Sequence, residues 1–171
     1  MTDPFETLGI EARFDLDLNA LAERHRALSG ALHPDRYASG SAGERRLALE
    51  KAVAVNEAWR TLRDPVKRAE TLLRRSGVEV GETAEPRPSP ELLMEMMEIR
   101  EELAEAQQKR DLDRIHKLAE RMRARERLVL ERLQTGFARG ADEGLVPVLG
   151  ELRYIRRFFE QLDAIEEELL N

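Results

Sequence analysis

The spacing of apolar and polar positions along the chain predicts a series of amphipathic helices. Between Asp17 and Leu32, apolar residues recur at steps of three and four, which places them on one face of a helix. A second pattern of this kind follows Ser41, which forms a capping box with Glu44, and continues to Leu62. Because only a short loop joins the two patterns, we expect the helices to pack as an antiparallel hairpin.

Two shorter helices are predicted on either side of this hairpin. Asp3 and Pro4 have the residue types of a helix cap and a first-turn position. Asp64 and Pro65 repeat this pattern after the hairpin and begin a helix that should end at Gly77.

The second half of the chain predicts three further helices that pack as a bundle. We expect them from about Pro90 to Lys109, from Asp111 to about Gln134, and from near Val146 to the C-terminus, with a loop at 136–144.

The distribution of proline divides the chain between these two sets of helices. Residues 76–90 hold three of the seven prolines, which is typical of a fairly stiff linker. We therefore predict an all-α protein with an N-terminal domain at 1–75, a linker at 76–90 and a three-helix bundle at 91–171.

The first helix of the bundle carries more apolar residues than one buried face requires. Its core stripe consists of Leu92, Met96, Ile99, Leu103 and Ala106. Relative to Leu92, the apolar residues Leu93, Met97 and Met94 lie at about 100°, 140° and 200° on the helical wheel. They neighbour Glu98 and Glu101, and methionine adapts to varied partners, so the pattern suggests a second contact surface. The alternative is that neighbouring helices bury this helix on two sides.

Composition excludes several classes of site. The chain has no cysteine, so it can form neither a disulfide nor a cysteine-ligated metal site, and we expect no metal or cofactor. The N-terminal segment has no signal-peptide pattern, and no apolar run is long enough to span a membrane, which favours a soluble, cytoplasmic protein with no membrane partner. The net charge is −6 and is carried mainly by the second half, which argues against nucleic acid as a partner.

The short segment His33-Pro34-Asp35 lies at the predicted tip of the hairpin. Together with Asn56 to Leu62 at the end of the hairpin's second helix, this segment makes residues 3–75 resemble a J-domain. The resemblance implies that His33, Pro34 and Asp35 dock on the ATPase domain of a DnaK-class chaperone. It also implies that basic residues near the loop add electrostatic attraction, for which the candidates here are Arg24, Arg26 and Arg36. The alternatives are an ordinary turn and solvated arginines. His25 falls on the apolar side of its helix, which favours a structural role.

Three further segments sharpen the resemblance. Residues 92–103, 37–41 and 58–63 are similar to the HscB family of J-domain co-chaperones of bacterial iron–sulfur cluster assembly. The similarity covers essentially the whole chain. It implies that the bundle binds the cluster scaffold IscU through an apolar patch with charged residues at its edge. The patch positions are Leu93, Met94, Met97 and Tyr154, and the edge positions are Glu98, Glu101 and Arg153. Met97 and Tyr154 depart from the family's residue types, which leaves the affinity open.

The resemblance implies an adaptor that catalyses nothing itself. It would deliver IscU to the DnaK-class chaperone HscA and stimulate its ATPase, which promotes cluster assembly and transfer. A J-domain protein with a different client is the alternative. A small enzyme is disfavoured, because the sequence contains only three histidines and neither a metal-ligand pair at helical spacing nor a phosphate-binding glycine loop.

Overall fold

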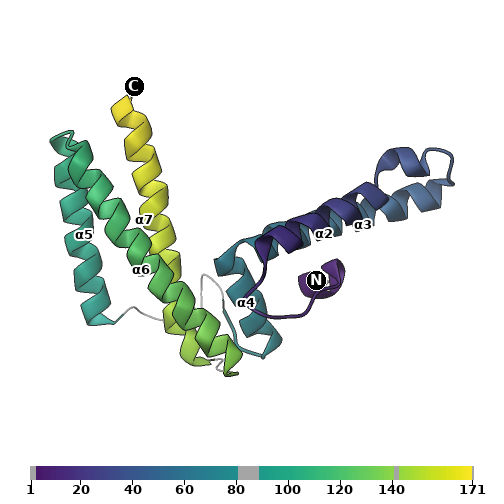
Figure 1. Ribbon diagram of the computed structural model, residues 1–171, viewed down its shortest axis with the longest axis horizontal. Helices are drawn as coiled ribbons and strands as arrows, with labels where there is room; N and C mark the ends of the chain where they lie inside the picture. The colour runs from purple at the N-terminus through teal and green to yellow at the C-terminus, as the bar shows by residue number, and fades with distance from the viewer. Residues whose placement is uncertain (1–2, 81–88, 141–142, 171) are drawn as a thin grey trace. The chain divides into compact units, whose positions relative to one another are not determined.

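The computed structural model describes residues 3–80, 89–140 and 143–170. Those residues form helices joined by short loops and contain no β-strand, so the all-α prediction is confirmed. The chain divides into two compact units, Met1–Arg75 and Ser76–Asn171. Figure 1 shows the helices of each. Residues 81–88 of the predicted linker lie outside the described residues.

The first unit is a helical hairpin with a short helix before it and another after it. Its elements are α1 (Pro4–Leu8), α2 (Leu18–Ala31), the 3-10 helix η1 (Pro34–Tyr37), α3 (Ala42–Arg63) and α4 (Pro65–Arg75). Helices α2 and α3 lie side by side, and η1 stands in the loop that joins them (Figure 1).

Local hydrogen bonds fix where these helices begin. Asp17 Oδ1 accepts from the backbone nitrogen of Asn19 at 2.9 Å. Ser41 and Glu44 form the predicted capping box, in which each side chain accepts from the other residue's backbone nitrogen. Asp64 Oδ1 accepts from the first turn of α4. These caps satisfy backbone donors that a helix start leaves unpaired.

The core of the first unit lies where α1 packs against α3 and α4 closes the end of the hairpin. Its most completely buried large side chains are Phe5, Leu8, Leu62 and Leu73. Arg68 is also buried, with its guanidinium 5.0 Å from the centre of the Phe14 ring, as in a cation–π contact. Burial lowers the pKa of Arg68, against the opposing effect of Asp64 and Asp15.

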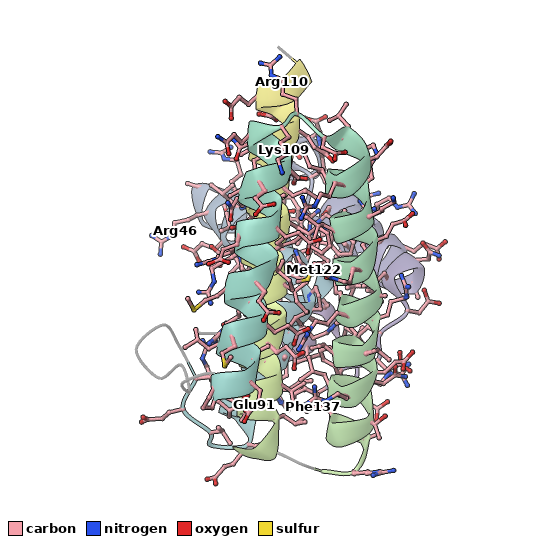
Figure 2. All side chains as sticks on the ribbon, turned by 90° about the vertical axis from the view of Figure 1, so that its left-hand side faces the viewer. Arg46, Glu91, Lys109, Arg110, Met122 and Phe137 are labelled. Carbon is pink, nitrogen blue, oxygen red and sulfur yellow. The ribbon has the colours of Figure 1, made fainter. Side chains whose placement is uncertain are left out.

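The second unit is a three-helix bundle. It contains α5 (Pro90–Gln108), α6 (Leu112–Ala138), the 3-10 helix η3 (Glu143–Leu145) and α7 (Val146–Leu170). Figure 2 shows α5 and α6 standing side by side, with Met122 of α6 between them, and Met122 is fully buried. Ser89 caps α5 by accepting from the backbone nitrogen of Leu92, as predicted.

The predicted end of the second bundle helix is wrong. The presence of Gly136 predicted a loop from that residue, but α6 continues to Ala138. An added Cβ at Gly136 would lie 2.3 Å from a methyl carbon of Leu145, so glycine serves here to let η3 approach the helix closely. The residue that looked like a stop signal is therefore a packing position.

Ion pairs connect α5 and α6 along their length. Glu102 pairs with Arg121 at 2.9 Å and with Arg114 at 3.7 Å, and Glu95 pairs with Arg125. Arg121 and Arg125 of α6 thus both pair with the acidic first helix of the bundle. Arg123 instead lies over Phe159 of α7.

Among the described residues, no helix is both long and apolar enough to cross a membrane.

Candidate functional sites

The segment His33-Pro34-Asp35 lies between α2 and α3, where the sequence placed it. Helix α2 ends at Ala31, and His33 caps η1 with Pro34 at its first position. The backbone nitrogen of Asp35 and its carboxylate Oδ2 both lie 3.4 Å from His33 Nδ1. The side chains of His33 and Asp35 are 58% and 89% exposed. Because these mutual contacts are long, both polar groups remain available to a partner.

The loop that carries this segment is held by α3. Arg45 donates from Nη1 to the backbone oxygen of Gly40 at 3.1 Å and lies 3.5 Å from that of Ala38. Glu44 accepts from both the backbone nitrogen and the hydroxyl of Ser41, and these hydrogen bonds lower the pKa of Glu44. The chain between η1 and α3 is therefore pinned at its α3 end, which reduces the ordering cost of binding at the tip.

The three candidate arginines have different surroundings. Arg24 donates from Nε to the backbone oxygen of Leu8 at 2.9 Å, which ties α2 to the end of α1. Arg26 and Arg36 have exposed side chains. Arg24 therefore has a structural contact with α1 in addition to its predicted role in binding. Neither Arg26 nor Arg36 makes this contact.

His25 has the surroundings of a structural residue. Its ring stacks on Trp59 of α3, with centres 5.1 Å apart and planes at 14°. Its Nε2 lies 2.8 Å from Asn56 Oδ1. These contacts join α2 to α3, as expected from its place on the apolar side of the helix.

Helix α5 presents an apolar surface that the bundle does not cover. Its buried side chains are Met96, Ile99, Leu103 and Ala106. Leu93, Met94 and Met97 are 50%, 64% and 55% exposed. The alternative of burial on two sides is therefore wrong for these three residues. Three large apolar side chains on adjacent turns of one helix are typical of an interaction surface.

Tyr154 of α7 lies beside this helix. The side chain is half-buried, and its hydroxyl donates to the backbone oxygen of Met96 at 3.3 Å. The Arg100 guanidinium lies 5.3 Å from the centre of the Tyr154 ring. The phenol is thus fixed to α5 at both its hydroxyl and its ring face.

The charged residues predicted at the edge of the patch lie on the same two helices. Glu98 and Glu101 on α5 are exposed, and Arg153 on α7 is half-buried. Arg100 was absent from the predicted set although it contacts Tyr154. The helical wheel held the signal for it, because Arg100 lies at about 80° from Leu92 and so next to Leu93. We name Leu93, Met94, Met97 and Tyr154 the apolar patch.

In the part of the chain that the structure describes, no group of three histidine, cysteine or acidic residues could hold a metal ion.

A J-domain-like hairpin with an exposed His-Pro-Asp tip, together with a three-helix bundle bearing an apolar patch, defines the class of J-domain co-chaperones. The family model described as the HSCB C-terminal oligomerisation domain matches residues 88–163. A co-chaperone protein HscB homolog of Burkholderia multivorans is 37% identical over 96% of this chain and 94% of its own length. One from Paraburkholderia xenovorans is 32% identical over 98% of this chain. The chain belongs to the HscB co-chaperone family.

Solved structures agree with this assignment. The chaperone HscB from Vibrio cholerae matches with a TM-score of 0.84 and 32% identity, over 98% of this chain and 99% of the other. The human co-chaperone protein HscB matches with a TM-score of 0.89 and 25% identity, over 97% of this chain and 83% of the other. The protein is therefore a J-domain co-chaperone of iron–sulfur cluster assembly.

Proposed function

We propose that this protein is an adaptor that binds the iron–sulfur cluster scaffold IscU through its bundle and presents it to a DnaK-class chaperone of the HscA type. The tip of the first unit stimulates the ATPase of that chaperone, which couples scaffold delivery to ATP hydrolysis. The adaptor catalyses no reaction itself. The cytoplasmic location expected from the sequence is part of the same proposal.

The exposed apolar patch is the observation that carries the scaffold half of this proposal. A bundle helix needs only one buried stripe, yet α5 exposes Leu93, Met94 and Met97 beside Tyr154. The edge residues Glu98 and Glu101 supply negative charge and Arg153 supplies positive charge, so the surface suits a partner that combines apolar side chains with charges of both signs. The assignment of this surface to a scaffold rests on the chain's membership of the HscB family.

The geometry of the tip supports the chaperone half. Asp35 offers an exposed carboxylate that can accept a pair of hydrogen bonds from an arginine of the chaperone. Pro34 restricts the backbone at the start of η1, so little conformational freedom remains to be lost on docking. Arg26 on α2 and Arg36 in η1 supply positive charge near this tip.

Calorimetric titration of the protein with purified IscU tests the scaffold half. Burying the exposed halves of Leu93 and Met97 is worth roughly 1 kcal/mol each, so Leu93→Ala with Met97→Ala should raise the Kd by about 30-fold. His33→Gln is the matched control and should leave this Kd unchanged. An unchanged Kd in the double variant, or no binding by the native protein, would refute the assignment of this surface to IscU.

An ATPase assay with purified HscA tests the chaperone half of the proposal and uses the same two variants of the protein. His33→Gln should abolish stimulation, and the Leu93/Met97 variant should stimulate normally when no scaffold is present. Circular dichroism must show native helicity in both variants. Loss of helicity in His33→Gln would show that His33 is structural rather than a docking residue.

A further inference from the structure

One cluster of charged side chains joins all three helices of the bundle. Arg125 of α6 donates from Nη1 to Glu95 of α5 and from Nε to Glu151 of α7, the latter at 2.8 Å. Arg132 of α6 donates to the other oxygen of Glu151 at 2.9 Å. We name Glu95, Arg125, Arg132 and Glu151 the three-helix ion cluster.

The centre of the cluster, Arg125 and Glu151, is sheltered from solvent, whereas Glu95 and Arg132 are about half exposed. Glu151 is only 8% exposed and lies on the core face of α7, next to the fully buried Leu152. Burial opposes the charge of Arg125, but the hydrogen bonds that it donates to Glu95 and Glu151, together with the negative charge of these carboxylates, outweigh burial and raise the pKa of Arg125. A buried carboxylate that lost its partner would carry a large desolvation cost, so Arg125 and Glu151 hold each other in place.

The cluster lies directly beside the apolar patch. On α5, Glu95 immediately follows Met94, and on α7, Tyr154 lies one turn after Glu151. A hollow of about 380 Å³ lies between the helices, and its lining includes Glu95, Arg125, Glu151 and Tyr154. Because this space is not filled by core side chains, the distance between α5 and α7 at this level depends on the side chains that reach across it.

We infer that Arg125 is a positioning residue for the scaffold-binding surface, because it fixes the separation of α5 and α7 and so holds Tyr154 beside Leu93 and Met97. The inference rests on the proposed function, since it concerns the same surface. An arginine suits this task because its planar group donates in two fixed directions, to carboxylates on two different helices. A lysine has one charged nitrogen and cannot reproduce both contacts.

Arg125→Leu and Arg125→Lys test this inference in the full-length protein, and Arg121→Leu is the matched control. Arg121 also pairs with α5, through Glu102, but this ion pair does not extend to α7. We expect Arg125→Leu to raise the Kd for IscU about tenfold, mainly through faster dissociation. An effect of this size is typical of residues that do not touch the partner but position the residues that do. Arg125→Lys should weaken binding in the same direction, and Arg121→Leu should change the Kd less than about twofold.

A second measurement separates positioning from a general structural role. The chain has five methionines, of which Met94, Met96 and Met97 lie on α5, so methyl-labelled methionine resolves this surface by NMR without any partner. Arg125→Leu should shift the Met96 and Met97 methyl signals, whereas Arg121→Leu should leave them in place. Stimulation of the chaperone ATPase without scaffold should be unchanged in all variants.

The two readouts decide the inference together. Weaker binding with shifted methyl signals supports it, and unchanged methyl signals overturn it, whatever the Kd does. A Kd unchanged in both Arg125 variants also overturns it. If the native protein does not bind IscU, the proposed function fails instead, and the methyl spectra alone then show whether Arg125 positions α5 against α7. Should Arg125→Leu not fold, Arg125→Lys carries the same comparison.

Discussion

Substituting alanine for either of two helical glycines should change stability in opposite directions. Gly136 lies in α6, where an added Cβ would meet Leu145 Cδ2 at 2.3 Å and two further Leu145 carbons at 3.1 Å. Gly30 lies in α2, where an added Cβ would meet nothing within 4 Å. The same chemical change is therefore made at one crowded and one open helical position.

The magnitudes follow from two competing effects. Alanine in a helix interior is more stable than glycine by about 0.5–1 kcal/mol. At Gly136 the methyl would overlap the isopropyl group of Leu145, which is itself buried at 5% exposed. Overpacking of this kind costs about 1–3 kcal/mol. We therefore expect Gly136→Ala to lower the free energy of unfolding by ~1–2 kcal/mol and Gly30→Ala to raise it by ~0.5–1 kcal/mol.

Urea unfolding followed by circular dichroism measures both changes, and fluorescence of the single tryptophan, Trp59, reports separately on the unit that contains Gly30. Leu145→Ala supplies the control, because it removes the carbons that the new methyl would meet. On that background, Gly136→Ala should become neutral or stabilising. A stabilising effect of Gly136→Ala in the native background would show that η3 does not approach α6 as described.

Two contacts of the first unit give further predictions. Arg24→Ala should lower the free energy of unfolding by ~1 kcal/mol, because Leu8 loses a charge-assisted hydrogen bond, whereas Arg26→Ala should reduce ATPase stimulation at unchanged stability. Urea midpoints and ATPase rates check this, and equal stabilities would contradict it. The folded-state pKa of Glu44 is lowered, so its cap contribution is present above its ordinary pKa of 4.5 and is lost as pH falls through the lower folded value. The stability of Glu44→Gln should therefore depend less on pH than that of the native protein between pH 5 and about 3. Thermal melting at a series of pH values measures this, and identical profiles for the two proteins would show that the Glu44 carboxylate contributes nothing to the pH dependence of stability.

The sequence predicted most of the helix boundaries because their determinants are local. The caps at Asp17, Ser41 and Asp64 each depend on side chains within three residues of the helix start, and all three are present. The predicted C-terminal end of α6 was wrong because its determinant is not local. Gly136 is tolerated inside the helix because of Leu145, nine residues away and in another element, and no local pattern records that contact.

The core of α7 shows a similar limit at the level of single residues. The three- and four-residue spacing of apolar residues in α7 predicts that Phe159 and Leu169 face the core. Phe158 is instead the buried ring, at 2% exposed, while Phe159 is half-buried against it. Steps of three and four both fit a helical period of 3.6, so adjacent aromatic residues cannot be ranked without the neighbouring helices. Leu169, also predicted to face inward, lies outside the side chains that the structure describes.

The α5 part of the apolar patch could be predicted from the sequence of one helix, whereas the three-helix ion cluster could not. Exposure of Leu93 and Met94 follows from the angle of each on its own helix, so a wheel built from one segment was enough to single them out. Glu151 looks like a solvated residue by type, and its burial is possible only because Arg125 and Arg132 on a different helix neutralise it. A binding surface can therefore be recognised from one helix, whereas the contacts that hold that surface in shape depend on the packing of all three.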